Sequence, residues 1–303
     1  MMQNHNVQGH LLASFTELVW GTTFVATKVL LRTFTPLEIM IARFALGFLA
    51  LLLAGGGWMR AQKRSHEALF ALAGLTGVTL YFLMENIALT YISASLVGVI
   101  VAAAPLCTAL FAAVLLQERL SRWFFLGFVC AMTGVALASL AGVTELALDP
   151  RGVLLGVGAA VVWGAYSVLV RRLGAMGYRT APLTCRIFGY GLLFLLIPAC
   201  VEGFPAPLSA WAEPQHLANL LFLGLLASAT CFVTWNRAVF LLGPVKTSAY
   251  IYATPIITIV SSALILHERM TPVMWLGTAL ALGGLILSER RDKPRQPDRP
   301  AAE

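Results

Sequence analysis

Long apolar stretches alternate with short polar segments along the whole chain. A helix needs about 20 residues to cross the roughly 30 Å hydrocarbon core of a bilayer. No stretch has the alternation of apolar and polar residues that a barrel strand requires, and lipid offers backbone groups no other partners. The pattern predicts an all-α integral membrane protein with ten transmembrane helices, near residues 11–31, 36–55, 68–90, 93–116, 122–141, 151–172, 180–200, 216–242, 245–267 and 271–288.

Much of the sequence occurs twice. A shift of 150 residues gives the matches Asn86/Asn236, Pro105/Pro255, Glu118/Glu268, Arg119/Arg269, Gly127/Gly277 and Gly134/Gly284. Further upstream, a shift of 143 residues gives the matches Trp20/Trp163, Gly21/Gly164, Lys28/Arg171 and Arg43/Arg186. One longer loop between Cys200 and Gln215 explains the difference between the two shifts. Duplication in an apolar chain is typical of a transporter built from two structural repeats.

The composition agrees with a membrane protein, because a chain that is 59% hydrophobic and 12% charged has too little polar surface for a soluble 303-residue globule. Lys and Arg gather on one side of the predicted helices, which is the cytoplasmic side by the positive-inside rule. The inside segments then hold Arg60, Lys63, Arg64, Arg119, Arg122, Arg171, Arg172, Arg179, Lys246, Arg290, Arg291, Lys293, Arg295 and Arg299. The outside segments hold Lys28, Arg32, Arg151 and Arg269.

This orientation places both termini in the cytoplasm and the protein in the cytoplasmic (inner) cell membrane. Each repeat has an odd number of predicted helices, so the second repeat must be inverted relative to the first. The predicted units are a cytoplasmic tail at 1–10, a first repeat at 11–141, a second at 151–288, and a disordered basic cytoplasmic tail at 289–303. The tail and the charge asymmetry explain the net charge of +7.

Several classes of protein are disfavoured. Basic residues are not interleaved with aromatic ones, so we expect no nucleic-acid partner. No catalytic motif or phosphate-binding loop is present, so we expect no enzyme and no cofactor. The cysteines lie in apolar helices with spacings that fit neither a metal site nor disulfides. The expected partners are a small-molecule substrate and the lipid bilayer, with the protein a monomer or a homodimer.

One face of the first predicted helix carries Glu17, Trp20, Gly21, Phe24 and Lys28. The matching face of the sixth reads Ala160, Trp163, Gly164, Ser167 and Arg171, so the carboxylate is not repeated. The paired tryptophans suit a wall that lines a substrate cavity. They equally suit plain packing beside a glycine that allows close helix approach.

Polar residues also occur inside the third and eighth predicted helices. Tyr81 and Glu85 share a face, and Asn86 follows them. Asn236 is the counterpart of Asn86 in the second repeat. Buried amides of this kind either contact substrate or join helices by hydrogen bonds worth about 1 kcal/mol.

Pro105 and Pro255 lie in the middle of the fourth and ninth predicted helices. Each removes a backbone hydrogen bond and kinks its helix. Two kinks at matching positions indicate a cavity at the midplane of the membrane, although a packed helix also tolerates proline.

Charged residues at similar depth form two groups. Lys28, Arg43 and Glu85 belong to the outer half, and Glu17 and Arg186 belong to the inner half, together with Arg171 and Arg237. Such groups either close the ends of a pathway or neutralise buried charge. A buried Glu17 either titrates as a proton carrier or is held ionised by a cation such as Arg186.

Both halves, over residues 11–288, resemble EamA-type members of the drug/metabolite transporter superfamily. The motifs are Trp20 with Gly21, the stretch at 88–95, Ala-Pro at 104–105 and Glu-Arg-Leu-Ser at 118–121. The resemblance implies two inverted five-helix repeats and export of small metabolites such as amino acids by alternating access. It also implies a central cavity that includes Trp20, Tyr81, Trp163, Asn236 and Tyr250.

Glu17 is similar to the first-helix glutamate of the small multidrug resistance proteins, where the carboxylate binds protons and cationic drugs in turn. The sequence therefore predicts an exporter of amino acids or similar small metabolites. The alternative is a proton-coupled antiporter of cationic drugs. Substrate contacts are expected at Trp20, Phe24, Tyr81, Glu85, Asn86, Trp163, Asn236 and Tyr250, and coupling or gating at Glu17, Lys28, Arg43 and Arg186.

Overall fold

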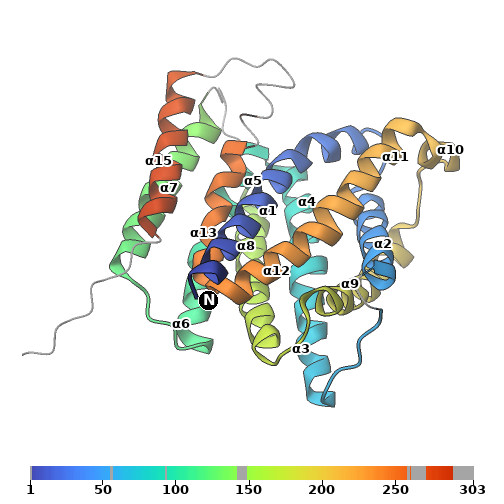
Figure 1. Ribbon diagram of the computed structural model, residues 1–303. Coiled ribbons are helices and arrows are strands. Elements are labelled where there is room, and N and C mark those ends of the chain that lie inside the picture. The colour runs from blue at the N-terminus through green and yellow to red at the C-terminus, as the bar shows by residue number, and fades with distance from the viewer. Residues whose placement is uncertain are drawn as a thin grey trace, which may run out of the picture.

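The computed structural model describes residues 2–54, 57–92, 94–141, 149–257, 260 and 271–288, apart from the side chains of residues 2–5, 24, 25, 28, 89, 90, 94–96, 139 and 140. Every regular element in these ranges is a helix (Figure 1). The first half contains α1 (Met2–Leu30), α2 (Pro36–Ala54), α3 (Arg64–Gly74), η1 (Leu75–Leu80), α4 (Tyr81–Tyr91), α5 (Ala94–Val101), α6 (Ala104–Leu115) and α7 (Arg122–Leu140). The second half contains α8 (Pro150–Ala175), α9 (Thr180–Glu202), α10 (Leu208–Ala212), α11 (Pro214–Leu221), η2 (Phe222–Thr230), α12 (Cys231–Leu242), α13 (Pro244–Ala249), η3 (Tyr250–Ala253) and α15 (Pro272–Ser288).

Several of these helices are long and apolar enough to cross a membrane. In the described part of the chain six stretches meet this requirement, namely Pro36–Ala54, Arg64–Ala88, Val97–Leu115, Pro150–Ala175, Thr180–Glu202 and Pro214–Leu242. Arg122–Ala138 and Pro272–Ser288 are shorter apolar helices. Large apolar side chains such as Leu53, Val114 and Val201 point outward and are 84%, 77% and 85% exposed. A surface of this kind suits contact with lipid, so the fold is that of a multi-pass, all-α membrane protein.

Two helices contain a π-helical segment. η1 joins α3 to α4, and η2 joins α11 to α12, so each forms one continuous stretch with its neighbours. A π-helical segment leaves backbone carbonyls without their usual partners and often occurs at functional sites. In η2 the Ala227 carbonyl accepts a hydrogen bond from Trp20 Nε1 at 2.8 Å.

Both mid-helix prolines lie directly after an irregular turn. The helical path is interrupted between α5 and α6, where Pro105 occupies the first turn of α6. Pro255 follows η3, which winds as a 3-10 helix. Both breaks follow from the missing proline N–H, which the carbonyl four residues earlier would otherwise accept.

α7 and α15 pack side by side on one flank of the molecule (Figure 1). Their contact is close because glycines face backbone: a Cβ added at Gly134 would lie 2.3 Å from Ala281 N, and one added at Gly284 would lie 2.4 Å from Ala131 N. Gly127 and Gly277 make the corresponding approaches to Gly284 and Gly134. The two helices therefore run antiparallel.

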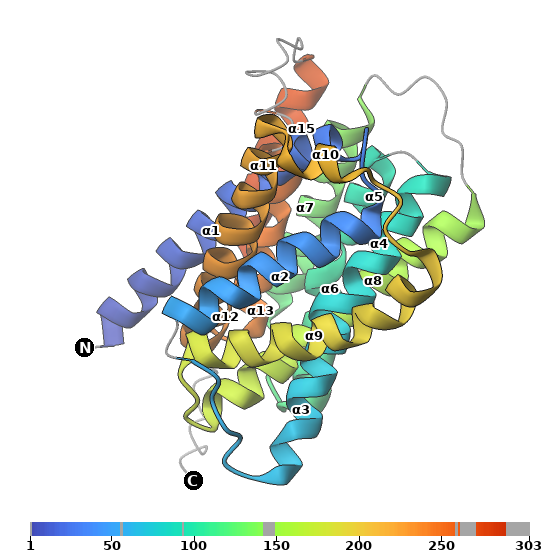
Figure 2. The ribbon, with the colours of Figure 1, turned by 90° about the vertical axis from the view of Figure 1, so that its right-hand side faces the viewer.

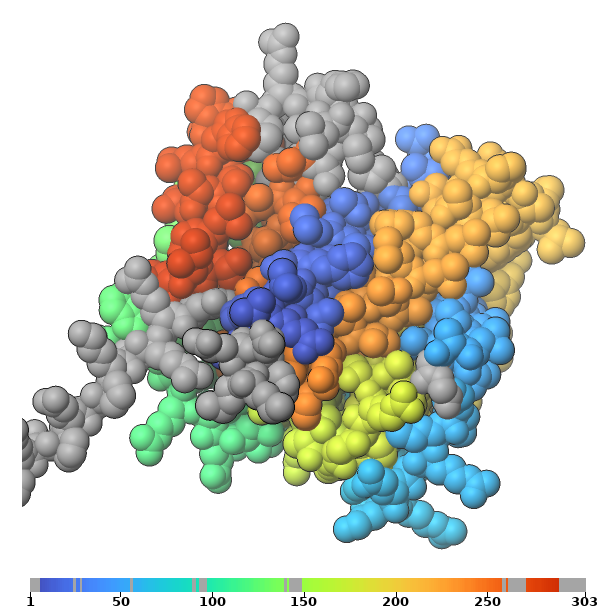
Figure 3. Space-filling model, viewed as in Figure 1, coloured from blue at the N-terminus to red at the C-terminus, as the bar shows by residue number. Residues whose placement is uncertain are grey.

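The remaining helices surround the main hydrophobic core. α1 crosses one face of the molecule beside α12 (Figure 3). α2 and α9 lie together on the face shown in Figure 2. Their shared core contains Phe44, Trp163, Phe188, Phe232 and Trp235.

The helix limits differ from the sequence expectation in several places, among them the start of α3 at Arg64 instead of residue 68. α1 begins at Met2, so residues 2–10, expected to be a tail, continue the first helix. Gly9 lets this extension pass close to Leu242 of α12. The expected loop between Cys200 and Gln215 contains the short helix α10. The ninth expected helix, 245–267, is described only to residue 257 and at residue 260, and the C-terminal tail lies outside the described residues.

Candidate functional site

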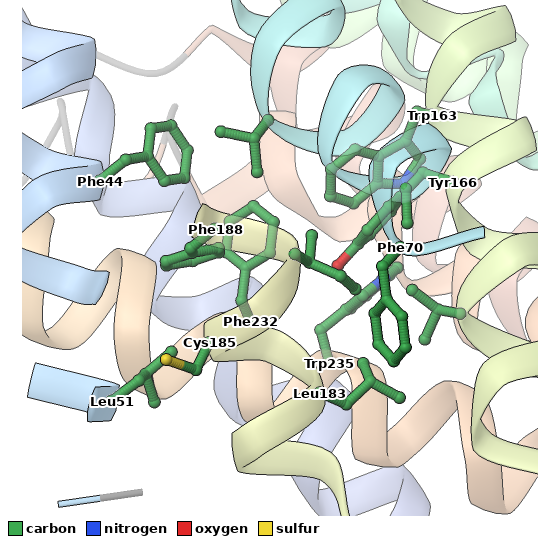
Figure 4. Close-up of a cluster of buried hydrophobic side chains, with 14 of the residues drawn as sticks. Phe44, Leu51, Phe70, Trp163, Tyr166, Leu183, Cys185, Phe188, Phe232 and Trp235 are labelled. Atoms are coloured by element: carbon green, nitrogen blue, oxygen red, sulfur yellow. The ribbon is translucent and has the colours of Figure 1, made fainter. Parts of the chain in front are cut away.

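Three tryptophans from three helices meet in the core. The Trp20 ring of α1 lies 5.6 Å from the Trp163 ring of α8 and 5.2 Å from the Trp235 ring of α12, measured between centroids. Trp163 and Trp235 are 6.0 Å apart, and Tyr81 of α4 lies 4.8 Å from Trp163. Figure 4 shows Trp163, Trp235 and Phe232 as neighbours in this cluster. We call Trp20, Tyr81, Trp163, Phe232 and Trp235 the aromatic cluster.

The indole N–H groups of the cluster differ in their partners. Trp20 donates to the Ala227 carbonyl. Trp163 and Trp235 are 4% and 0% exposed, and their Nε1 atoms have no hydrogen-bond partner among the described residues. Buried polar groups are normally paired, so these two donors are exceptions.

The Asn236 amide makes a hydrogen bond at each end inside the protein. Its Oδ1 accepts a hydrogen bond from the Tyr166 hydroxyl at 2.7 Å, and its Nδ2 donates to Thr184 Oγ1 at 3.0 Å. The network joins α8, α9 and α12 beside the aromatic cluster, since the Tyr166 ring is 5.2 Å from Trp163. The counterpart Asn86 is half-buried on α4. The two asparagines therefore have unequal surroundings, and Asn236 has a structural role here.

A small pocket opens next to Asn236. Its lining residues come from α8, from the turn between α8 and α9, from the start of α9 and from α12: Val170, Gly174, Tyr178, Thr180, Leu183, Asn236, Arg237 and Phe240. Tyr178 also accepts a hydrogen bond from Gln62 N at 2.9 Å. We call the end of the bundle that carries residues 57–63 and 176–179 the Tyr178 end. The pocket therefore lies at the Tyr178 end, and Asn236 is the lining residue that adjoins Trp235 in the sequence.

Glu17 is buried at 1% exposure, one turn before Trp20. Thr254, the residue before Pro255, donates a hydrogen bond to its Oε2 atom. Its Oε1 atom has no partner among the described residues. Arg186, the expected cation for Glu17, has a different partner.

Arg186 contacts Glu67 instead of Glu17. Its guanidinium donates to both carboxylate oxygens of Glu67 and to the Met59 carbonyl, and the Tyr190 hydroxyl donates to Glu67 Oε2 at 2.6 Å. The ion pair joins α9 to α3 at the Tyr178 end. Glu67 precedes the expected start of its helix at residue 68, so it was not among the carboxylates predicted to lie within the membrane.

Arg43 of α2, the counterpart of Arg186 in the first half, has different contacts. Its Nε donates to Ser228 Oγ of η2 at 3.0 Å, and its guanidinium lies 5.0 Å from the Phe82 ring centroid. The Glu85 carboxylate attracts Arg43 electrostatically and accepts a hydrogen bond from Tyr81 at 3.2 Å. Arg43, Tyr81 and Glu85 therefore form one polar group next to the aromatic cluster.

The other expected site residues are dispersed. Tyr250 lies in η3, where its hydroxyl is 2.6 Å from His10 Nδ1 of α1, and it packs against the edge of the main hydrophobic core. The side chains of Phe24 and Lys28 lie outside the described residues. In the described part of the chain no three His, Cys, Asp or Glu side chains lie close enough together to hold a metal ion.

Two contributors were not among the predicted site residues. Trp235 adjoins Asn236 in the sequence, but the repeat pattern gave no tryptophan partner for it, since position 85 is Glu. Tyr166 follows Trp163 by three residues and shares its helix face. Both are aromatic residues within three positions of a repeated residue, and this signal could have identified them.

The protein is an apolar all-helical bundle with buried polar groups around its centre, and this architecture is typical of membrane transporters. The model of the EamA-like transporter family matches residues 7–140 and again residues 150–290. The chain belongs to this family.

Two relatives named as an exporter and a transporter agree with this assignment, and a solved structure has the same fold. The chain is 31% identical to a probable terminal-alkyne amino-acid exporter of Streptantibioticus cattleyicolor, with 93% of each chain covered. It is 26% identical to an uncharacterized transporter of Archaeoglobus fulgidus, over 93% of this chain and 98% of the relative. A crystal structure at 22% identity superposes with a TM-score of 0.74, covers 93% of this chain and 96% of that one, and shows the fold alone.

Proposed function

We propose that this protein exports amino acids or similar small metabolites through a central pathway by alternating access. The observation that carries the proposal is the aromatic cluster, where three helices bring large rings and unpaired polar atoms to the centre of a bundle. Aromatic walls with a few placed polar groups are typical of small-molecule sites. The name of the Streptantibioticus cattleyicolor relative, a probable amino-acid exporter, supports the same substrate class.

We further propose ten transmembrane helices in two inverted five-helix repeats. The contact between α7 and α15 supports this arrangement, because the shift of 150 residues that relates the repeats exchanges its two sides. Gly127 approaches Gly284, and Gly277 approaches Gly134. A two-fold axis between antiparallel, equivalent helices produces such reciprocal contacts.

The irregular segments support the same proposal. The shift of 150 residues carries η1 (Leu75–Leu80) onto residues 225–230, which lie inside η2. It also carries the break at 102–103 onto residues 252–253, which lie inside η3. Equivalent helices thus depart from regular α-helix at equivalent positions, and discontinuous helices of this kind surround the substrate in other repeat transporters.

Transport by the purified protein is the direct test. The full chain is reconstituted alone into sealed vesicles and supplied with radiolabelled L-amino acids. We expect time-dependent accumulation of at least one amino acid above that of protein-free vesicles. A protein that binds no amino acid and moves none contradicts the proposed substrate class.

Energy coupling is assigned to Glu17. Glu17→Gln keeps the shape and hydrogen bonding of the side chain and removes its titration. A proton-coupled carrier is then expected to lose accumulation driven by a pH gradient while it retains exchange at equal, saturating concentrations, with weaker substrate binding if the carboxylate contacts an ammonium group of the substrate. Unchanged accumulation at unchanged abundance contradicts proton coupling and leaves a facilitative carrier. Proton-driven uptake of a cationic drug with no amino-acid transport favours the antiporter alternative.

The proposed orientation places both termini in the cytoplasm and the protein in the inner membrane. It rests on the Lys and Arg distribution and the positive-inside rule. A reporter fused after Glu303 is expected on the cytoplasmic side, and a cysteine placed next to Trp211 is expected to react with an impermeant reagent from outside. Labelling near Trp211 only after permeabilisation contradicts this orientation.

A further inference from the structure

Trp163 and Trp235 present two buried hydrogen-bond donors without an acceptor among the described residues. Trp20, in contact with both rings, has its N–H satisfied by the Ala227 carbonyl. The protein thus pairs one indole of the three. The two unpaired donors belong to neighbouring rings, whose centroids are 6.0 Å apart. An indole nitrogen can only donate, so the missing partner must be an acceptor.

We propose that the indole N–H groups of Trp163 and Trp235 together bind the carboxylate of an amino-acid substrate. This inference rests on the proposed function and adds the chemical group that the site recognises. A carboxylate offers two oxygens with about four acceptor positions, so it can satisfy two donors at once. A hydrogen bond to an ionised acceptor is also about twice as strong as one between neutral groups.

Glu17 supplies the complementary acceptor for the ammonium group of the same substrate. Its Oε1 atom is buried without a partner among the described residues. It lies on α1 one turn before Trp20, whose ring touches both other indoles. On α12, Cys231 is one turn before Trp235 and within electrostatic range of Glu17. Two donors and one carboxylate at the border of the same cluster match the two ends of a zwitterion.

A small pocket at the Tyr178 end lies near this site. Asn236 lines the pocket and accepts a hydrogen bond from the Tyr166 hydroxyl, and the centroid of the Tyr166 ring lies 5.2 Å from that of Trp163. Arg237 lines the same pocket and provides positive charge, which favours the carboxylate end of an incoming zwitterion.

The test compares ligands that differ in one charged group. The full chain in detergent is screened for binding with the L-amino acids one at a time, for example L-leucine. The best ligand is then compared with its amide, which lacks the carboxylate, and with its deaminated acid, which lacks the ammonium; for leucine these are leucinamide and isocaproate. We expect each analogue to bind at least about tenfold more weakly, because it leaves a buried group unpaired.

Single variants assign the carboxylate to the two tryptophans. Trp163→Phe and Trp235→Phe remove the N–H and keep an aromatic ring, and Trp275→Phe on α15, where the side chain is 58% exposed, is the matched control. We expect each of the first two to weaken amino-acid binding about tenfold and to leave the weak affinity for the amide within about twofold. The control is expected to bind like the wild type.

The outcomes separate this inference from the proposed function. Vesicle transport of an amino acid by the wild type, together with equal binding of acid and amide, overturns the inference alone. Trp163→Phe and Trp235→Phe variants that both bind like Trp275→Phe overturn it in the same way. A wild type that moves no amino acid overturns both. The ligand comparison uses the wild type only, so a variant that fails to fold leaves a decisive measurement.

Discussion

Arg43 and Arg186 occupy matching positions in the two halves of the chain, and their partners differ in kind. Arg186 is held by the Glu67 carboxylate, with Tyr190 bonded to the same carboxylate. Arg43 donates to the neutral Ser228 hydroxyl, and the Glu85 carboxylate attracts it electrostatically. Both arginines make charge-assisted hydrogen bonds, but Arg186 holds its carboxylate through two of them, and such bidentate pairs add energy and geometric specificity. The contacts of Arg186 therefore hold the Tyr178 end more firmly than the contact between Arg43 and Ser228 holds α2 to η2, although an arginine lies at both places.

This inequality suits a carrier that opens one end at a time. In such a carrier, the contacts that close one end must break before that end opens. Contacts that close the other end then form. The two arginines each reach from α2 or α9 to the π-containing stretch of the opposite half, namely to η2 or to α3 next to η1. The scaffold is repeated, whereas the closing contacts are specific to each half.

The largest expected effect concerns the scaffold, where the halves should behave alike. Gly134→Leu and Gly284→Leu each place a side chain against backbone less than 3 Å away, and overpacking costs about 1–3 kcal/mol or more. We expect both variants to lose folded protein to a similar extent in size-exclusion profiles and thermal unfolding. Gly283→Leu is the control, because a Cβ there meets nothing within 4 Å. Loss in only one of the two variants contradicts the reciprocal contact.

A smaller effect separates the two arginines. Glu67→Ala leaves Arg186 buried without its carboxylate, and we expect a loss of roughly 1–3 kcal/mol, toward the lower limit because Glu67 is 35% exposed. Ser228→Ala removes one bond to Arg43 and is expected to cost about 1 kcal/mol or less. Thermal unfolding in detergent measures both. A Ser228→Ala variant that is the less stable of the two reverses the comparison.

An effect of about the same size as that of Ser228→Ala is expected from the tyrosine that supports the ion pair. Tyr190→Phe removes one hydrogen bond to Glu67 and is expected to cost about 0.5–1.5 kcal/mol. Tyr91→Phe is the matched control, since the described contact of Tyr91 with Arg151 uses the ring. Equal melting temperatures for both variants would show that Tyr190 adds nothing to the closure.

Most of the fold could be predicted from the sequence, because apolar length fixes where helices run in a membrane. α7, α9 and α15 begin and end within two residues of their predicted limits. The start of α1 could not be predicted, because residues 2–10 lack the apolar pattern, and only packing against α12 reveals their role. The π-helical segments were also missed, since a change of winding leaves no regular trace in side-chain spacing.

The site was predicted in part for a similar reason. The repeat pattern singled out Trp20 and Trp163, and the helix face singled out Tyr81, and these three residues meet. Arg186 was named as one cation that could hold Glu17 ionised, and its partner in the structure is Glu67, which is 119 residues away in sequence. Depth alone cannot choose between two carboxylates that come from different helices.

The measurement that tests the role of the Tyr178 end most directly is transport with this end locked. In a variant whose native cysteines are replaced, Gln62→Cys and Arg179→Cys are joined by a cleavable cross-linker, and amino-acid uptake into vesicles is followed before and after cleavage. If the substrate passes between α3, α8 and α9, uptake should stop when the cross-link forms and resume when the cross-link is cleaved. Uptake that continues at the uncross-linked rate while the end is locked would contradict a pathway through the Tyr178 end.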